Sequence, residues 1–355
     1  MSAMDLDTQM SGTAPLAEKD RLDEAALDRW MRETVPDYAG PLALTKFKGG
    51  QSNPTYRIDT PARSYVLRRQ PFGPLLPSAH AVDREYRIIA ALHPTGFPVA
   101  RGYGLCEDAS VLGAKFYVMG MVEGRNLWNG AIPSVAALDR RALYEAMTDT
   151  IAALHRLRPT EIGLADYGKP GAYCERQIAR WSKQYRLSET GPVPEMDRLI
   201  EWLPTTIPPQ LGEGIAHGDF RLDNLIFAAD EPKVLAVLDW ELSTLGDPIA
   251  DFTYYLMSWV MPADGRASLG GLDLMALGIP TLEETVARYE AATGLTVPAL
   301  DWYLAYNLFR IVAIIQGIKK RLKDGTASSA QAAEMAARVE PLARIAWDYA
   351  VKAGA

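Results

Sequence analysis

Three oxygen-bearing side chains, Asp219, Asn224 and Asp239, are the residues of this sequence best placed to do chemistry together. Asp219 and Asn224 lie just before a short apolar run at 225–228, and Asp239 lies just after a second run at 234–238. Turn residues separate the two runs, so we predict a β-hairpin that returns Asp239 to the neighbourhood of Asn224. An amide and a carboxylate held together can bind a hard cation, and the second carboxylate, Asp219, is then left beside it as a base.

The order and spacing of these residues are similar to those of protein kinases, which use H-R-D-x-x-x-x-N and then D-F-G for the base and the metal ligands. Here His217-Gly-Asp219 and Asn224 keep the same Asp-to-Asn interval, and Asp239 is followed by Trp240. The sequence thereby resembles the aminoglycoside phosphotransferase and choline kinase-like family. That resemblance implies an α+β, bilobal protein kinase-like fold, with a small β-rich N-lobe and a larger, mainly helical C-lobe. Taken singly, each aspartate is equally typical of a turn cap, but the complete set favours phosphoryl transfer.

The resemblance also implies a role for each polar residue of the motif. Asp219 is the catalytic residue expected to orient an acceptor hydroxyl and take its proton, and Asn224 and Asp239 are expected to hold Mg²⁺. Arg221 carries a charge suited to balancing the transferred phosphoryl group. His217 is expected to support the loop by hydrogen bonding rather than to accept protons.

A helix is predicted to open directly after this region. In Gly246-Asp-Pro-Ile-Ala-Asp251, Asp247 is expected at the N-cap and Pro248 in the first turn. Asp251 matches a family position that braces the catalytic loop, so we predict a structural role with catalytic consequences.

The N-terminal part of the chain contains the features expected of a nucleotide-binding lobe. Runs at 42–47, 56–59 and 64–69 predict three strands, and a short turn separates the first two. The turn residues that we assign to phosphate binding are Gly49, Gly50, Ser52 and Asn53. Backbone N–H groups of such a turn would lie over the phosphates of ATP, and the segment resembles the G-G-x-S-N form of the family. Two adjacent glycines alone would more often be an ordinary hairpin turn.

Arg68, near the end of the third predicted strand, stands where the V-A-I-K pattern of kinases places its lysine. An arginine keeps the charge and can hold phosphate oxygens bidentately. A helix predicted over 79–92, capped by Ser78, places Glu85 in an otherwise apolar stripe, where a carboxylate needs a cationic partner. We therefore predict an Arg68–Glu85 ion pair; the alternatives are a surface arginine and a glutamate at the edge of the stripe.

Gly120-Met-Val-Glu-Gly124 marks the predicted crossing between the lobes. In the family this connector offers backbone groups and an apolar bed to the adenine, so the resemblance places Met119 and Met121 at the nucleotide. We predict a flexible tail at 1–20, an N-lobe at 21–122 and a C-lobe at 123–355. The remaining predicted strands are 97–101 and 115–119, and the predicted helices are 22–32, 135–156, 173–187 and 301–323. His155 is expected to be a packed or capping residue outside the site.

Composition excludes several classes of protein. The chain has 355 residues, 48% hydrophobic and 23% charged, which is typical of a globular protein with ordinary cores. A net charge of −7 argues against an extended nucleic-acid surface. Cys106 and Cys174 fit a reducing cytoplasm, no charged leader precedes an apolar core, and no apolar run reaches the length of a membrane span. We therefore expect a cytoplasmic protein without nucleic-acid or membrane partners, of unknown oligomeric state.

The last hundred residues point to the acceptor. Tyr303 to Arg310 and Ile314-Ile-Gln-Gly-Ile318 resemble the kinase-like module that some eukaryotic proteins carry ahead of an acyl-CoA dehydrogenase. That branch implies a hydroxyacyl-CoA as the small-molecule acceptor. The basic cluster Lys319, Lys320, Arg321 and Lys323 either meets CoA phosphates or forms a solvated face.

Two other functions stay open. The first is an aminoglycoside or other small-alcohol kinase, although a pocket for a cationic acceptor should be rich in carboxylates and 300–323 offers only Asp301 before the basic cluster. The second is a non-catalytic nucleotide-binding sensor, which loss of Asp219 or Asp239 would have favoured. The acyl chain length, the hydroxyl position and the choice between ATP and GTP are not encoded in a recognisable pattern.

Overall fold

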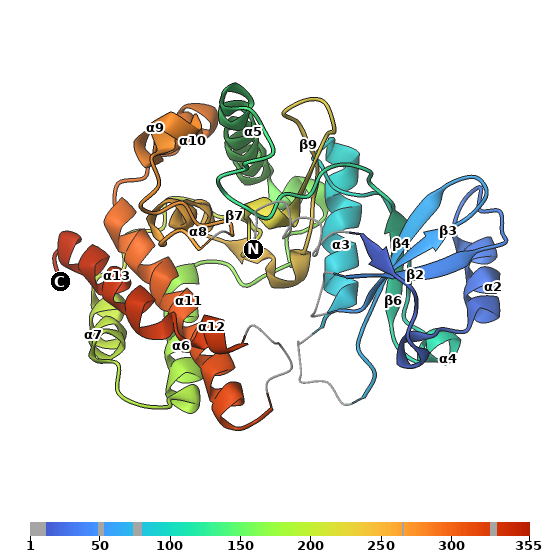
Figure 1. Cartoon of the computed structure of the whole chain (residues 1–355), viewed down its shortest axis with the longest axis horizontal. Coiled ribbons are helices and arrows are strands. Elements are labelled where there is room, and N and C mark those ends of the chain that lie inside the picture. The colour runs from blue at the N-terminus through green and yellow to red at the C-terminus, as the bar shows by residue number, and fades with distance from the viewer. Residues whose placement is uncertain (1–11, 49–52, 74–79, 265, 327–331) are drawn as a thin grey trace.

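The computed structural model describes residues 12–48, 53–73, 80–264, 266–326 and 332–355. A six-stranded antiparallel sheet, built from residues before 121, forms one side of the molecule, and helices from residue 137 onward form the other, larger side (Figure 1). Helix α3 (Val82–Leu92) lies between the sheet and the helical part (Figure 1). The α+β kinase-like architecture predicted from the sequence is therefore the observed one.

The sheet places Arg68 on the face that meets α3. Its order is β1-β2-β3-β4-β6-β5, and the strands are β1 (Thr13–Ala14), β2 (Ala43–Phe47), β3 (Thr55–Asp59), β4 (Ser64–Arg69), β5 (Gly102–Cys106) and β6 (Phe116–Gly120). Tyr65 and Leu67 of β4 enter the smaller core of the sheet with Tyr56. Because strand side chains alternate between faces, Arg68 lies on the opposite face.

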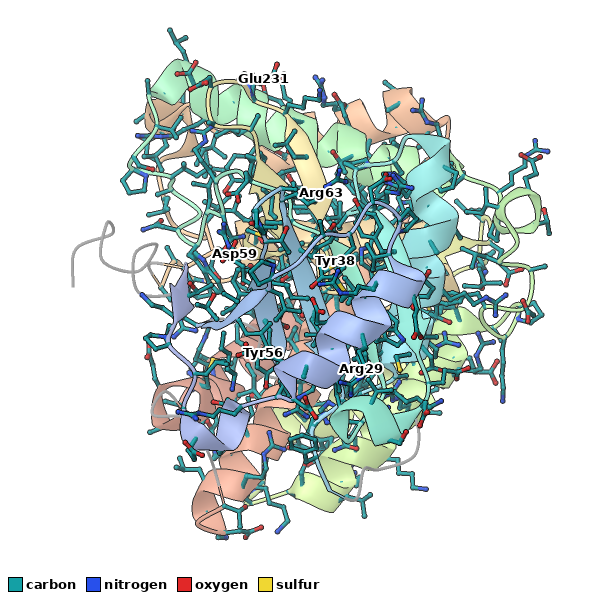
Figure 2. The ribbon with its side chains drawn as sticks, turned by 90° about the vertical axis from the view of Figure 1, so that its right-hand side faces the viewer. Arg29, Tyr38, Tyr56, Asp59, Arg63 and Glu231 are labelled. Atoms are coloured by element: carbon teal, nitrogen blue, oxygen red, sulfur yellow. The ribbon has the colours of Figure 1, made fainter. Side chains whose placement is uncertain are left out.

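Helix α2 (Glu24–Thr34) covers the other face of the sheet, as Figure 2 shows from the side that carries Arg29 and Tyr38. The Asp23 side chain caps the helix by accepting from Ala26 N at 2.9 Å, and apolar residues of α2 enter the smaller core. Residues of the predicted tail are attached to the same lobe, since β1 pairs with β2 and Asp20 lies 2.7 Å from Lys46. From residue 13 onward the segment therefore differs from the expected flexible tail.

One predicted strand is wrong. Residues 97–101 form no strand, and the edge strand of the sheet is β5, which follows them. Pro98 has no N–H to donate to a neighbouring strand, and its carbonyl instead accepts from Val237 N at 2.8 Å. Phe97 and Val99 are buried in the larger core beside α3. The apolar run therefore reports burial rather than sheet pairing.

The helical part is organised around α11, which passes through its centre. Its helices are α5 (Ala137–Arg156), α6 (Tyr173–Ser188), α7 (Pro194–Trp202), α8 (Pro248–Val260), α9 (Leu274–Leu277), α10 (Leu282–Thr293), α11 (Leu300–Lys323), α12 (Ala332–Ala336) and α13 (Val339–Lys352), whereas the short helix α4 (Ala109–Leu112) belongs to the sheet side. Helix α11 is buried on most sides and packs against α6, α8, α12 and α13 (Figure 1). Within the described ranges, no helix is long and apolar enough to span a membrane.

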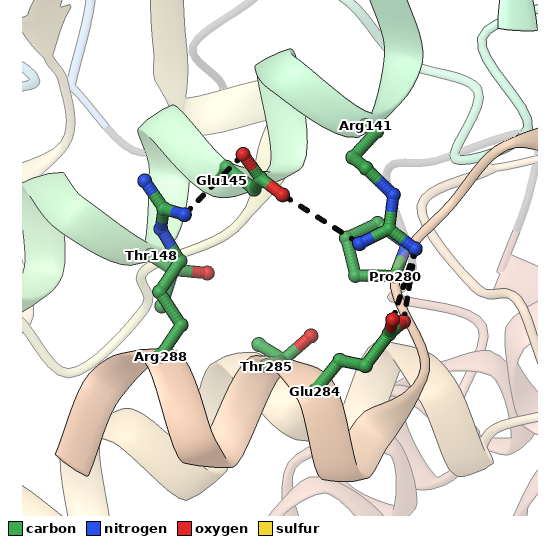
Figure 3. Close-up of a pocket in the computed structure, with 7 residues that line it drawn as sticks. All are labelled: Arg141, Glu145, Thr148, Pro280, Glu284, Thr285 and Arg288. Atoms are coloured by element: carbon green, nitrogen blue, oxygen red, sulfur yellow. Dashed lines mark hydrogen bonds and ion pairs between the residues drawn. The ribbon is translucent and has the colours of Figure 1, made fainter. Parts of the chain in front are cut away.

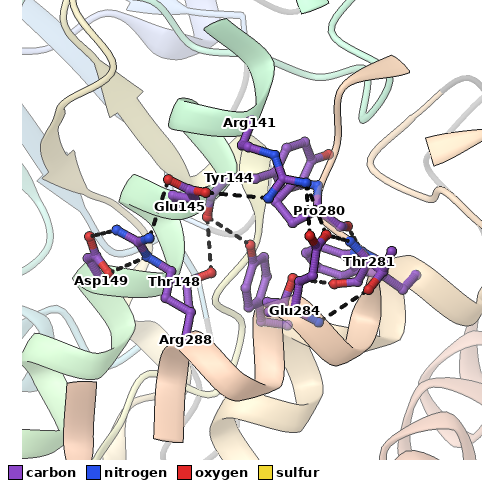
Figure 4. A network of polar contacts seen from close by, with 12 residues as sticks. Arg141, Tyr144, Glu145, Thr148, Asp149, Pro280, Thr281, Glu284 and Arg288 are labelled. Atoms are coloured by element: carbon purple, nitrogen blue, oxygen red, sulfur yellow. Dashed lines mark hydrogen bonds and ion pairs between the residues drawn. The ribbon is translucent and has the colours of Figure 1, made fainter. Parts of the chain in front are cut away.

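A chain of ion pairs joins α5 to α10 around a small cavity of about 80 Å³ (Figure 3). Arg288 lies 2.7 Å from Asp149 and 3.3 Å from Glu145, and Arg141 lies 3.0 Å from Glu284 (Figure 4). These side chains are substantially exposed, so each pair contributes at most about 1 kcal/mol. The charges around the cavity are paired with one another, which makes it a helix–helix contact rather than a binding site.

Two small two-stranded sheets complete the fold. Strand β7 (Gly214–Ala216) pairs with β10 (Thr244–Gly246), and β8 (Leu225–Phe227) pairs with β9 (Val234–Val237). The second is the hairpin predicted from the sequence. The loops that leave β7 and β9 carry the candidate site.

Candidate active site

Asp219 lies in the loop between β7 and β8, with a different donor on each carboxylate oxygen. Tyr254 of α8 donates its hydroxyl to Oδ1 at 2.6 Å, and Asn224 Nδ2 donates to Oδ2 at 3.0 Å. Burial raises the pKa of the Asp219 carboxyl, and the nearby charge of Arg221 and the hydrogen bond from Tyr254 oppose that rise. The group is thus a carboxylate in a desolvated place, held by two neutral donors.

His217 is fully buried and its ring is committed to the loop. Nε2 lies 2.8 Å from the carbonyl oxygen of Leu238, which fixes this nitrogen as the donor. Nδ1 therefore accepts, and it receives the backbone N–H of Asp219 at 3.2 Å. The ring packs 4.6 Å from Trp240. The structure places His217 as a link between the Asp219 loop and the end of β9.

Asp251 holds the same loop from helix α8. Its carboxylate accepts from His217 N at 2.8 Å and from Gly218 N at 2.7 Å. His155 Nε2 lies 3.1 Å from Asp251 Oδ2, and its other ring nitrogen lies 2.7 Å from the Tyr289 hydroxyl. Burial alone would raise the pKa of Asp251, but the hydrogen bond and charge of His155 lead the effects that hold it below its ordinary value. The helix begins as predicted, with Asp247 accepting from Ile249 N at 2.9 Å.

Gly218 needs to be a glycine. Its φ is +84°, and a Cβ at this position would stand 2.9 Å from the carbonyl oxygen of Leu242. The carbonyl of Gly218 accepts from Arg310 Nη2 at 2.6 Å. The peptide before Asp219 is therefore held on one side by α8 and on the other by α11.

The β8–β9 hairpin brings Asp239 beside Asn224. Leu238 N donates to the carbonyl oxygen of Asn224 at 2.8 Å, and Asp239 follows at once with a φ of +62°. An aspartate tolerates this left-handed conformation better than most residues, at a cost on the order of 1 kcal/mol. Asp239 Oδ1 lies 2.7 Å from Arg68 Nη2, which fixes the carboxylate from the sheet side.

Arg68 and Glu85 are brought together as the sequence predicts. Arg68 Nε lies 2.8 Å from Glu85 Oε2, in a close ion pair whose geometry is not that of an aligned hydrogen bond. Glu85 is 1% exposed and also accepts from Asn53 Nδ2 at 2.6 Å and from the Tyr117 hydroxyl at 3.1 Å. Burial raises the pKa of Glu85 although the charge of Arg68 opposes this. Asn53 also lies 2.9 Å from His80, so its side chain supports Glu85 in this structure.

For the other residues assigned to the nucleotide, the structure gives backbone contacts only or no description. Gly49, Gly50 and Ser52 lie outside the described residues. Met119 pairs with Val66 inside the sheet, and Met121 N donates to Ser64 O at 3.3 Å at the junction between the lobes. Arg221 is half-exposed and forms an ion pair with Asp223, two residues along the same loop.

Four residues around the loop were not assigned to the site from the sequence. Tyr254 contacts Asp219 and Arg310 contacts the Gly218 carbonyl, while His155 contacts Asp251 and Tyr289 contacts His155. They come from α5, α8, α10 and α11, which are distant in the sequence from residues 217–239. One signal was available: Arg310 is a single charge within a long apolar run, where an unpaired cation would be costly.

The donor set fits a magnesium ion. Asn224 uses its amide nitrogen on Asp219, and among the described residues nothing donates to its amide oxygen. Asp239 has one oxygen on Arg68 and a second for a cation. Among the residues that the structure describes, no group of three or more His, Cys, Asp and Glu forms a metal cage. Magnesium in kinases is commonly held by one or two protein oxygens together with nucleotide phosphates, so no such cage is required.

The fold and this set of residues define a kinase-like phosphotransferase that acts on hydroxyl groups of small molecules. Residues 43–303 match the phosphotransferase enzyme family, and the chain belongs to that family. Its curated relatives include acyl-CoA dehydrogenase family member 10 of Mus musculus, 42% identical over 348 residues, covering 96% of this chain and 32% of the relative. Acyl-CoA dehydrogenase family member 11 of Gallus gallus is 39% identical over 343 residues, covering 94% and 44%. The chain thus spans less than half the length of these relatives.

Solved structures give the same class. A chain from Ralstonia eutropha JMP134, provisionally assigned as an aminoglycoside phosphotransferase, has a TM-score of 0.87 and 49% identity, covering 94% of this chain and 99% of that one. An aminoglycoside phosphotransferase in complex with AMP-PNP and hygromycin B has a TM-score of 0.59 and 15% identity, covering 90% and 98%. The second likeness is one of fold alone.

Proposed function

We propose that this protein transfers the γ-phosphoryl group of Mg-ATP to the hydroxyl of a hydroxyacyl-CoA. The observation that carries the proposal is a connected set of contacts. Asp219 binds Asn224, Asn224 binds the residue before Asp239, and Asp239 binds Arg68. A base, two cation ligands and a phosphate-binding cation therefore converge from both sides of the molecule, as in-line phosphoryl transfer requires.

In the proposed reaction, Asp219 accepts a hydrogen bond from the acceptor hydroxyl and takes its proton as the oxygen bonds to the γ-phosphorus. The bond from that phosphorus to the β–γ bridging oxygen breaks, and ADP leaves. Arg68 holds the phosphates. Arg221 lies two residues after Asp219, and its side chain turns toward the transferred phosphoryl group. Magnesium bound by Asn224 and Asp239 would supply charge neutralisation on the phosphate oxygens.

The acyl-CoA acceptor is supported by the relatives that bear an acyl-CoA dehydrogenase name. The sequence adds a second argument. A polycationic aminoglycoside needs carboxylates in its pocket, and residues 300–323 offer only Asp301 before the basic cluster.

The basic cluster at the end of α11 is mostly occupied in this structure. Lys319 lies 2.5 Å from Glu340, and Lys320 lies 3.0 Å from Asp324. These pairs favour the solvated face over a CoA-binding site. Arg180 on α6, beside Trp181, forms no salt bridge with any described residue and is the better candidate for a CoA phosphate.

The test is transfer from Mg-ATP to a panel of hydroxyacyl-CoAs and aminoglycosides, with products identified by mass spectrometry. Asp219→Asn is the matched blank, because it keeps the shape of the side chain and removes the base. A phosphorylated acyl-CoA from the wild type alone is the expected result. Transfer only to an aminoglycoside would retain the mechanism and reject the acceptor, as the name of the Ralstonia eutropha neighbour would suggest. Nucleotide binding without transfer to either class would favour the sensor.

A further inference from the structure

Tyr254 contacts the reacting end of Asp219. It lies on α8 three residues after Asp251, so both residues lie on the helix face that meets the catalytic loop. Its hydroxyl donates to Asp219 Oδ1 at 2.6 Å, a length typical of a charge-assisted hydrogen bond. Burial, together with the charge of Asp219, raises the pKa of the Tyr254 phenol well above its ordinary value. The phenol is therefore a permanent donor and not a second base.

The two oxygens of Asp219 are held by different elements. Asn224, in the turn Leu222–Asn224, donates to Oδ2, and Tyr254 of α8 donates to Oδ1. The terminal torsion of an aspartate is broad, so a single donor would leave the carboxylate plane free to turn. Two donors from separate elements fix that plane, and each oxygen keeps further accepting capacity for another partner. A base needs this property if it is to align an alcohol with a phosphorus atom.

Arg310 holds the peptide group that precedes Asp219. The side chain is 4% exposed, and Nη2 donates to the Gly218 carbonyl at 2.6 Å. Its Nε is buried and, among the described residues, has no hydrogen-bond partner. Burying a cation without a carboxylate in contact is costly. Arg310 therefore is not buried to form a salt bridge, and its hydrogen bond goes to the loop that carries Asp219. The guanidinium lies 4.8 Å from the centre of the Tyr254 ring, which places both residues in one unit.

We propose that Tyr254 and Arg310 are positioning residues of the phosphoryl transfer, which hold the side chain of Asp219 and the peptide group before it in the orientation that the acceptor hydroxyl requires. The inference rests on the proposed function, since it takes Asp219 as the base. It adds Tyr254 of α8 and Arg310 of α11 to the residues that support the loop carrying Asp219. Loss of the Tyr254 hydroxyl should lower kcat about 10- to 100-fold, the size of effect expected when a catalytic group is misplaced.

The experiment compares Tyr254→Phe with Tyr255→Phe in the full chain. Tyr255 is the next residue of α8, is 1% exposed, and directs its hydroxyl to the Tyr144 carbonyl at 3.5 Å. The control thus removes a buried hydroxyl from the same helix without touching Asp219. A second pair, Arg310→Lys and Arg310→Met, compares a side chain that can still donate to Gly218 with one that cannot. The readouts are kcat, KM for acceptor and ATP, and hydrogen–deuterium exchange of residues 215–224.

We expect Tyr254→Phe to lower kcat about 10- to 100-fold while KM for ATP stays within about twofold, and Tyr255→Phe to change neither. Arg310→Lys should retain more of kcat than Arg310→Met. A Tyr254→Phe enzyme with the kcat of Tyr255→Phe would overturn the proposal. If the wild type transfers phosphate to no acceptor, the proposed function fails first and the exchange data decide this inference separately. Faster exchange of 215–224 in Tyr254→Phe alone then supports positioning, and equal exchange in both variants refutes it.

Discussion

Replacing Glu85 by glutamine tests how much the ion pair at the nucleotide side contributes. The substitution keeps the size of a side chain that is 1% exposed and removes only its charge. At the 2.8 Å between Arg68 Nε and Glu85 Oε2, two unit charges in an effective dielectric of 20 attract by about 6 kcal/mol. Desolvation offsets part of this attraction, and breaking such buried pairs costs about 3–5 kcal/mol in practice.

The surroundings of Arg68 place the expected loss of unfolding free energy at the lower end of this range. Arg68 Nη2 also lies 2.7 Å from Asp239 and 3.7 Å from Glu241, so Arg68 keeps two carboxylates nearby when Glu85 is neutralised. We therefore expect Glu85→Gln to lose about 3 kcal/mol of unfolding free energy. Drawn toward Asp239, the guanidinium is less available to phosphates, and Mg-ATP affinity should fall about 10-fold, or about 1.4 kcal/mol.

Urea unfolding gives the first quantity, and titration calorimetry with Mg-ATP gives the second. Glu107→Gln is the matched control: Glu107 lies 2.9 Å from Lys115 in the same lobe but is 64% exposed. That surface pair should be worth less than about 1 kcal/mol, with no effect on ATP binding. The reasoning is refuted if Glu85→Gln unfolds like Glu107→Gln and binds Mg-ATP with wild-type affinity.

Three further outcomes are expected. Asp239→Asn should lower transfer roughly 100-fold or more and raise the Mg²⁺ concentration needed for half-maximal activity, measured by initial rates during a magnesium titration. The lowered pKa of Asp251 means that the unfolded chain binds a proton at this residue more tightly than the folded chain does, so the free energy of unfolding should fall as the pH drops below the ordinary Asp pKa of 3.8. In urea unfolding measured across acidic pH, Asp251→Asn should lose the part of this fall that Asp251 causes. Arg288→Met removes the pairs at 2.7 Å and 3.3 Å between α10 and α5, and it should cost about 1 kcal/mol or less and leave kcat unchanged, as thermal unfolding and the transfer assay can show.

The parts of this structure that the sequence predicted are those with a local signal. Strand β4 has the predicted bounds, and α8 begins at the predicted cap, since Asp247 and Pro248 act within one turn. Helix α3 begins at Val82 rather than at 79, and the predicted cap Ser78 lies outside the described residues. The wrong strand at 97–101 has apolar residues of the right type, but periodicity cannot distinguish burial under a helix from pairing in a sheet.

The site divides in the same way. The sequence predicts that Asp219, Asn224 and Asp239 lie close together, because a single short hairpin separates the first two from the third; their catalytic and metal-binding roles stay predictions. Tyr254 and Arg310 reach the same loop from helices whose periodicity reports only that they are buried. Which buried tyrosine meets the base depends on how α8 and α11 pack, and that packing is set by many apolar contacts at once. Of these two residues, only Arg310 has a signal in the sequence, because it is a charged residue inside an apolar stripe.

Arg68 connects the two halves of the proposed chemistry. In this structure the guanidinium of Arg68 contacts Asp239. In the proposed reaction the guanidinium binds the phosphates and Asp239 binds the cation. Phosphate oxygens and Asp239 therefore compete for one donor, and a cation at Asp239 would weaken its attraction to Arg68. Binding of ATP and of Mg²⁺ should consequently favour each other by the same factor in both directions, because a coupling free energy is reciprocal. The ion pair with Glu85 does not take part in this exchange, since Glu85 keeps its own donors from Asn53 and Tyr117. Glu85 thus holds Arg68 at Nε, while Nη2 of Arg68 exchanges Asp239 for a phosphate oxygen.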